Sequence, residues 1–159
     1  MANKVLVAVF SASGVTKLVG REIARISGGD FFEIVPAEKY TSADLNYMNS
    51  RSRSSVEMND PSARPAIANR VSDMDSYDTL IIGFPIWWGV APRIIETFLE
   101  SYDLSGKTIL PFCTSGGSGV GKSDTALHKN VIGDVKWGKG VQINRPNEST
   151  IKSWLEKVL

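Results

Sequence analysis

An unbroken apolar run near the amino end limits the possible folds of this chain more than any other feature of its sequence. Residues 4–10 read Lys-Val-Leu-Val-Ala-Val-Phe, a pattern typical of a parallel strand covered on both faces. A small polar turn follows at residues 11–16, and apolar residues then recur at helical spacing until Gly28 and Gly29. We therefore expect a strand, a loop and a helix, with the strand central in its sheet.

The same alternation continues along the chain. Further strands are predicted at residues 31–35, 79–84, 108–113 and 140–143, and further helices at 94–99, after Ser123 and at 151–159. Strands that alternate with helices predict an α/β fold with a doubly wound parallel sheet and helices on both faces. Residues 40–75 are less regular, and we expect a helix within residues 43–59, then a loop that contains Pro61 and Pro65.

Bulk properties exclude several classes of protein. A chain of 159 residues with 42% hydrophobic composition predicts one domain, residues 1–159. Its single cysteine, Cys113, excludes an internal disulfide or a cluster of metal-binding thiolates. The net charge is +1, so we expect neither a nucleic-acid nor a membrane partner. The first apolar run is too short for a membrane span and lacks a cleavage pattern, which favours a cytoplasmic protein.

Ligands of open parallel sheets bind beyond the carboxyl ends of the strands, so three loops are candidates for a site. The loop at residues 11–16 offers hydroxyls, a glycine and the N–H groups of a starting helix, which together suit a phosphate. Its alternative interpretation is a plain capped turn between a strand and a helix.

The second and third loops suit a flat ligand. Residues 85–89 place two tryptophans beside a glycine, although one indole could instead fill the core and the other could cover a helix. Residues 114–119 are small and rich in exposed N–H groups, so their backbone could approach the edge of a ring. An ordinary flexible loop is the alternative for this segment.

Together these loops resemble the flavodoxin superfamily. Pro-Ile-Trp-Trp-Gly at residues 85–89 and Thr-Ser-Gly-Gly-Ser-Gly at residues 114–119 are similar to its short flavodoxin-like branch. The resemblance covers nearly the whole chain, including the Tyr-Thr, Asp-Leu and Arg-Pro pieces of residues 40–64. It implies a flavodoxin-like five-stranded sheet in the order 2-1-3-4-5, and FMN as the cofactor.

The resemblance also implies the residues of the cofactor site. Those for the phosphate are Ser11, Ser13, Gly14, Val15 and Thr16, where Ser13 replaces the family's usual threonine. Those along the isoalloxazine ring are Pro85, Ile86, Trp87, Trp88 and Gly89. Those for the other side of the ring and its polar edge are Thr114, Ser115, Gly116 and Gly117. No catalytic or metal-binding side chain is predicted, because His128 is expected at the surface and Cys113 in an inert buried position.

A competing motif overlaps the third loop. Residues 116–123 match the phosphate-binding pattern of nucleotide triphosphatases, glycine, four residues, then Gly-Lys-Ser. Only a few dozen residues follow, however, and no apolar strand ends in the aspartate that such enzymes use to hold magnesium. The flavin interpretation explains three loops and the triphosphatase interpretation only one, so we favour the flavin.

The sequence predicts FMN-dependent electron transfer and leaves the electron partner open. Flavodoxins that carry electrons are usually strongly acidic and cover the ring with a tyrosine, whereas this chain is nearly neutral and residues 114–121 contain no aromatic. An NAD(P)H-dependent reductase of quinone-like or other small acceptors is therefore the alternative to a carrier with a redox partner protein. A flavin-binding module of a larger assembly is a third class, which no residue favours.

Overall fold

A central parallel sheet organises the computed structural model, which describes residues 4–12, 14–46, 48–87, 90–114, 127, 131, 134–138 and 140–159. Its strands are β1 (Val5–Val9), β2 (Asp30–Glu33), β3 (Thr79–Pro85), β4 (Thr108–Thr114), β5 (Lys136–Trp137) and β6 (Val141–Gln142). They lie in the order β2-β1-β3-β4-β5, with β6 also paired to β4, and every pair is parallel. The predicted order 2-1-3-4-5 is confirmed.

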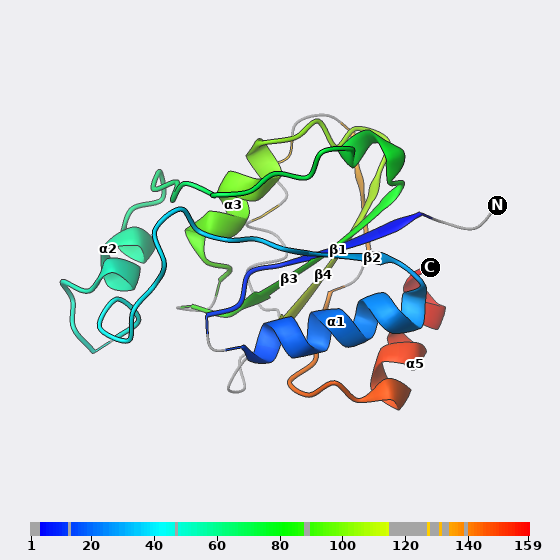
Figure 1. The fold of residues 1–159 in the computed structure, drawn as a ribbon, viewed down its shortest axis with the longest axis horizontal. Coiled ribbons are helices and arrows are strands. Elements are labelled where there is room, and N and C mark those ends of the chain that lie inside the picture. Colours follow the sequence, from blue (N-terminus) through cyan, green and yellow to red (C-terminus); the bar gives the residue numbers. More distant parts are fainter. Residues whose placement is uncertain are drawn as a thin grey trace.

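Helices cover both faces of the sheet (Figure 1). Helices α1 (Val15–Ser27) and α5 (Glu148–Val158) pack on one face, over Val5, Val7 and Val9 of β1. Helix α3 (Arg93–Glu100) packs on the other face, over Leu6 and Ala8. Alternate residues of one strand therefore enter different cores, which is why β1 is apolar along its whole length.

Two glycines set the ends of α1. Gly14, before the first turn, has φ +96°, and Gly28, after the last turn, has φ +72°. Both are left-handed conformations that a side chain disfavours. The Gly29 N–H donates to the Ala24 carbonyl oxygen at 3.0 Å and closes the helix, so the predicted end of this helix is confirmed.

The fifth position in the sheet differs from the prediction of one strand at residues 140–143. Two short strands occupy it, because β5 pairs with Thr108 and Ile109 whereas β6 pairs with Phe112 and Cys113. A Cβ on Gly138, between the two strands, would lie 2.1 Å from Cδ2 of Leu110. The chain passes close over that leucine instead of continuing as a regular strand.

The helix predicted within residues 43–59 is present, but it occupies only the end of that range. Helix α2 spans only Arg53–Asn59, with Ser52 as its N-cap. The Asn46 and Asn49 side chains accept hydrogen bonds from backbone N–H groups two residues further on, and these local bonds compete with a continuous helix. In Figure 1, α2 lies beyond the carboxyl end of β1, away from the layers of the sheet.

Two short segments, at residues 74–76 and 148–150, also differ from the prediction. A short 3₁₀ turn, η1 (Met74–Ser76), lies within the segment expected to be a loop. Helix α5 begins at Glu148, three residues before the prediction, because the Asn147 side chain accepts a hydrogen bond from the Thr150 N–H at 3.0 Å. None of the helices in the described part of the chain is long and apolar enough to span a bilayer.

Candidate functional site

Three strands bring the predicted loops to one edge of the sheet. Val9 of β1 is paired with Gly83 of β3, and Pro85 of β3 is paired with Thr114 of β4. The Ile86 N–H, just past β3, donates to the Thr114 carbonyl oxygen at 3.1 Å. The segments that follow β1, β3 and β4 therefore start side by side, at the carboxyl edge where ligands of such sheets bind.

The first loop ends in a helix terminus that suits an anion. The Gly14 N–H donates to the Ser11 hydroxyl at 3.0 Å, which tightens the turn before α1. Among the described residues, no side chain caps this terminus, and its first turn contains no acidic residue. The positive end of the helix dipole is therefore not neutralised by a carboxylate in its own first turn. Lys17 is half-exposed and pairs with Glu33 at 3.0 Å.

A hydrogen bond between two hydroxyls joins the first loop to the third. Oγ1 of Thr16 lies 2.7 Å from Oγ1 of Thr114, and both residues are buried. Thr16 is the second residue of α1, whereas Thr114 is the last residue of β4. This contact spans 98 positions in the sequence, so the sequence pattern alone did not predict it. Val15, by contrast, is exposed at the start of α1.

The second loop carries Trp87 into an aromatic cluster. Its backbone exchanges two hydrogen bonds with Val90, at 2.8 and 3.2 Å. The indole of Trp87 meets the ring of Phe10 edge-on, with centroids 5.7 Å apart. Pro85, Ile86 and Trp87 are all half-buried, so Trp87 contributes to packing and keeps part of its surface accessible.

Sequence reasoning missed Tyr40 as part of this cluster. Its ring lies 5.5 Å from that of Trp87 and 5.6 Å from that of Phe10, both in edge-on geometry. Tyr40 and Phe10 also line a cavity of about 210 Å³ on the β2 side of the first loop. Two sequence signals existed: the Tyr-Thr piece at residues 40–41, which belongs to the family resemblance, and an aromatic residue shortly after Pro36 in an otherwise polar stretch.

Several predicted positions lie outside the described residues. They are Ser13, Trp88, Gly89, Ser115, Gly116 and Gly117, together with His128 and the whole of the triphosphatase-like motif. Cys113 is described and fully buried beside Thr114. Burial raises the pKa of its thiol to about 11, as expected of an inert cysteine.

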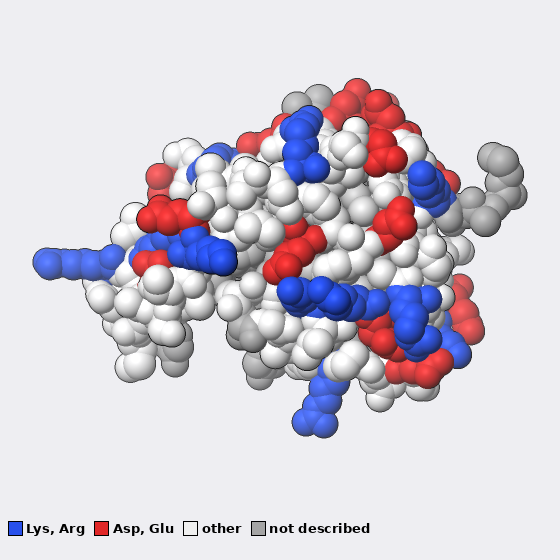
Figure 2. Space-filling view, in the orientation of Figure 1, with Lys and Arg blue, Asp and Glu red and all other residues white. Residues whose placement is uncertain are grey.

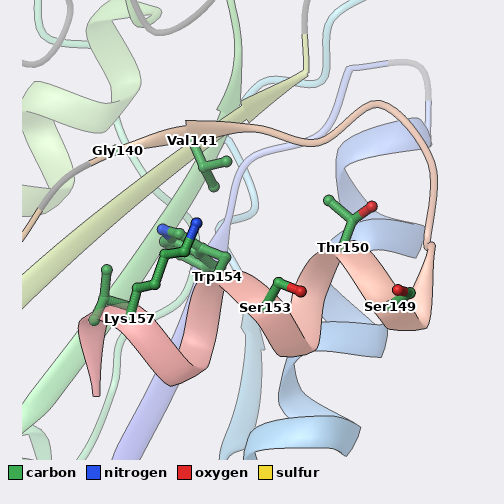
Figure 3. Close-up of a pocket in the computed structure, with 8 residues that line it drawn as sticks. Gly140, Val141, Ser149, Thr150, Ser153, Trp154 and Lys157 are labelled. Carbon is green, nitrogen blue, oxygen red and sulfur yellow. The ribbon is translucent and has the colours of Figure 1, made fainter.

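A second hollow has a different setting. It measures about 540 Å³ and lies between β6 and α5 (Figure 3). Gly140, Val141, Ser149, Trp154 and Lys157 are among its lining residues. All of its lining residues belong to β6, α5 or their immediate neighbours, so it shares no residue with the three loops.

Comparisons with known proteins agree with this geometry. Residues 4–158 match the family model described as flavodoxin. A candidate flavoprotein from Bacteroides eggerthii is 50% identical, over 98% of each chain, with a TM-score of 0.93. One from Bacteroides uniformis is 47% identical, over 98% of this chain and 99% of that one, with a TM-score of 0.92.

A more distant structure contains a ligand. The Lactobacillus acidophilus flavoprotein, solved in complex with FMN, is 24% identical over 97% of this chain and 99% of its own, with a TM-score of 0.71. A search of curated protein sequences finds no significant match.

Proposed function

We propose, since the chain belongs to the flavodoxin family, that it binds FMN at the carboxyl edge of β1, β3 and β4 and transfers electrons through it. The observation that carries the proposal is the Thr16–Thr114 hydroxyl pair, which joins the start of α1 to the end of β4. The relatives at 50% and 47% identity, both described as candidate flavoproteins, support it. So does the FMN complex of the more distant relative.

The described residues fit the phosphate of FMN. A phosphate dianion accepts hydrogen bonds and donates none, so it matches a helix start that offers N–H groups and a hydroxyl. Thr16 would donate to the phosphate, and its oxygen would then accept from Thr114. Ser11 shapes the turn through the Gly14 N–H. With Gly14, Val15 and the predicted Ser13, these residues would form the phosphate loop.

The second and third loops would hold the ring. When bound, the isoalloxazine ring supplies the capacity to accept and release electrons, while the protein sets its position and surroundings. Pro85, Ile86 and Trp87 stand at the end of β3 beside Thr114. We propose that Trp88, Gly89, Ser115, Gly116 and Gly117 complete this part of the site.

Carrier and reductase are the two candidate activities of a flavin bound at this site. On the face shown in Figure 2, basic and acidic side chains lie next to one another. Such a face does not select a strongly charged redox partner by long-range attraction. The absence of an aromatic side chain from residues 114–121 supports the reductase, since an uncovered ring face would admit NAD(P)H and a quinone-like acceptor.

One spectroscopic experiment tests both levels of the proposal. The purified protein is titrated with FMN, and the complex then receives NADPH or NADH without oxygen. A bound flavin that only dithionite reduces would identify a carrier with a protein partner, whereas rapid bleaching by either nucleotide would identify a reductase. Absence of any FMN binding would contradict the proposed function.

A further inference from the structure

Tyr40 stands between the second loop and the segment around α2. It follows β2 by seven residues, and its ring packs edge-on against both Trp87 and Phe10. Edge-on pairs are directional, because the positive rim of one ring faces the negative face of the other. The orientation of Tyr40 therefore constrains the orientation of Trp87.

Two side chains of α2 hold Tyr40 in position. Its hydroxyl donates to Oε1 of Glu57 at 2.5 Å, and the Arg53 guanidinium lies 3.8 Å from its ring centroid. Arg53 also pairs with Glu57 at 2.9 Å. Burial, followed by the hydrogen bond to Glu57, raises the pKa of the Tyr40 phenol, so the phenol stays a neutral donor.

The far end of the second loop is tied to the same segment. Arg93, the first residue of α3, donates from Nη2 to the Met58 carbonyl oxygen at 2.9 Å and from Nε to that of Glu57 at 3.3 Å. Its Nη1 also pairs with Glu96 at 2.8 Å. Helix α2 is thus connected to Trp87, through Tyr40, and directly to Arg93 beyond it.

We propose that Tyr40 is a positioning residue for the flavin ring, which acts by holding Trp87 and the second loop in place. The inference rests on the proposed function and deepens it, because it assigns the segment around α2 a role in the cofactor site. Glu57 supports Tyr40 through the hydroxyl, and Arg53 supports it through the ring. No step of electron transfer passes through Tyr40.

The test compares two substitutions at Tyr40 with a matched control. Tyr40→Phe keeps the ring and removes the bond to Glu57, whereas Tyr40→Leu also removes both ring contacts. Tyr77→Phe is the control, because the Tyr77 hydroxyl also donates to a carboxylate, Asp30, but near the amino ends of β2 and β3. Each protein is measured for FMN affinity, flavin midpoint potential and the circular dichroism of the bound flavin.

We expect Tyr40→Leu to raise the FMN dissociation constant about 2- to 100-fold, the equivalent of one or two lost ring contacts. The midpoint potential and the circular dichroism of the bound flavin should also change in Tyr40→Leu. In all three measurements, the values for Tyr40→Phe should lie between those for Tyr40→Leu and the wild type. The values for Tyr77→Phe should equal those for the wild type. If both Tyr40 variants match the wild type in all three measurements, the inference is wrong and FMN binding stands. If Tyr40→Leu does not fold, Tyr40→Phe decides alone by the same criteria. A wild-type protein that does not bind FMN would overturn the proposed function as well.

Discussion

The Thr16–Thr114 pair gives a prediction about two single residues. In the proposed site Thr16 donates to the FMN phosphate, a hydrogen bond worth about 1.5–3 kcal/mol, so Thr16→Ala should lower the FMN affinity about 10- to 100-fold. Thr114→Val should lower the FMN affinity less, because the Thr114 hydroxyl lies 2.7 Å from that of Thr16 and is proposed to act on the phosphate through it. Isothermal titration with FMN measures both.

Non-additivity is the decisive result for this pair. In the Thr16→Ala background, adding Thr114→Val should change the FMN affinity no further, since its hydrogen-bond partner is already gone. Thr114→Ser keeps the hydroxyl and serves as the matched control. Fully additive losses would show that Thr114 contacts the ligand independently of Thr16.

Cys113 should be inert in the native protein. Its thiol is fully buried, and burial raises its pKa to about 11, so very little thiolate exists near neutral pH. A thiol reagent at mildly alkaline pH should therefore leave the folded protein unmodified and label one thiol per chain after unfolding in urea. Rapid labelling of the folded protein would place Cys113 in an accessible position.

At the scale of elements, the centre of the sheet depends on a glycine. Gly83 of β3 is paired with Phe112 of β4, and a Cβ at Gly83 would lie 2.2 Å from Cζ of that ring. Gly83→Ala should therefore lower the free energy of unfolding by about 2–3 kcal/mol, as for other overpacked cores. Urea unfolding measures this change.

The double variant tests the stated cause. Phe112→Leu shortens the side chain that a Cβ at position 83 would meet, so Gly83→Ala should cost less stability in that background. Equal costs in the two backgrounds would assign the loss to the backbone of β3 instead of to the ring.

The link between Tyr77 and Asp30 predicts a dependence on alkaline pH. The Tyr77 hydroxyl donates to Oδ2 of Asp30 at 2.6 Å, and burial, with that hydrogen bond, raises the pKa of Tyr77 to about 12. Because the folded pKa exceeds the unfolded value of 10.0, the stabilisation is complete below pH 10 and is lost towards pH 12.

Tyr77→Phe isolates this contribution to stability. Between pH 10 and pH 12, the free energy of unfolding of the wild type should fall more steeply than that of the variant. Parallel pH profiles in urea unfolding would show that the Tyr77 phenol does not carry the dependence.

Local sequence patterns correctly predicted the elements that residues close in the sequence determine. The apolar run sufficed to predict β1, because that strand is buried on both faces. The glycines sufficed to predict the ends of α1, because Gly14 and Gly28 have a left-handed φ. The sequence did not predict that two strands share the fifth position of the sheet. Strands of two residues are too short to show a periodic pattern, and the close approach of Gly138 to Leu110 is a contact between distant residues. The start of α2 was also not predicted, because it depends on hydrogen bonds from backbone N–H groups to the Asn46 and Asn49 side chains, which compete with a longer helix.

At the scale of the molecule, topology was predictable and long-range side-chain contacts were not. Alternating strands and helices predicted a doubly wound parallel sheet, and the family resemblance implied the strand order that the structure has. In such a sheet the three loops lie at one edge. Tyr40 and Trp87 lie far apart in sequence and meet only because the segment around α2 folds beside the second loop. A pattern of apolar and polar residues predicts local elements, but it does not predict which distant side chains come into contact.

Binding of FMN should stabilise the whole fold by mass action. At a ligand concentration one hundred times the dissociation constant, the gain is about 2.7 kcal/mol. For a chain of 159 residues, this corresponds to a rise in the melting temperature of about 5–10 °C. Differential scanning calorimetry against FMN concentration measures it.

Riboflavin, which has the ring without the phosphate, separates the two halves of the site. It should raise the melting temperature less than FMN does, because it leaves the N–H groups at the start of α1 without an anion. In Thr16→Ala, FMN and riboflavin should raise the melting temperature by more similar amounts than in the wild type, since one proposed donor to the phosphate has been removed. Equal shifts from both ligands in the wild type would mean that the first loop contributes nothing to binding and that the ring alone is recognised.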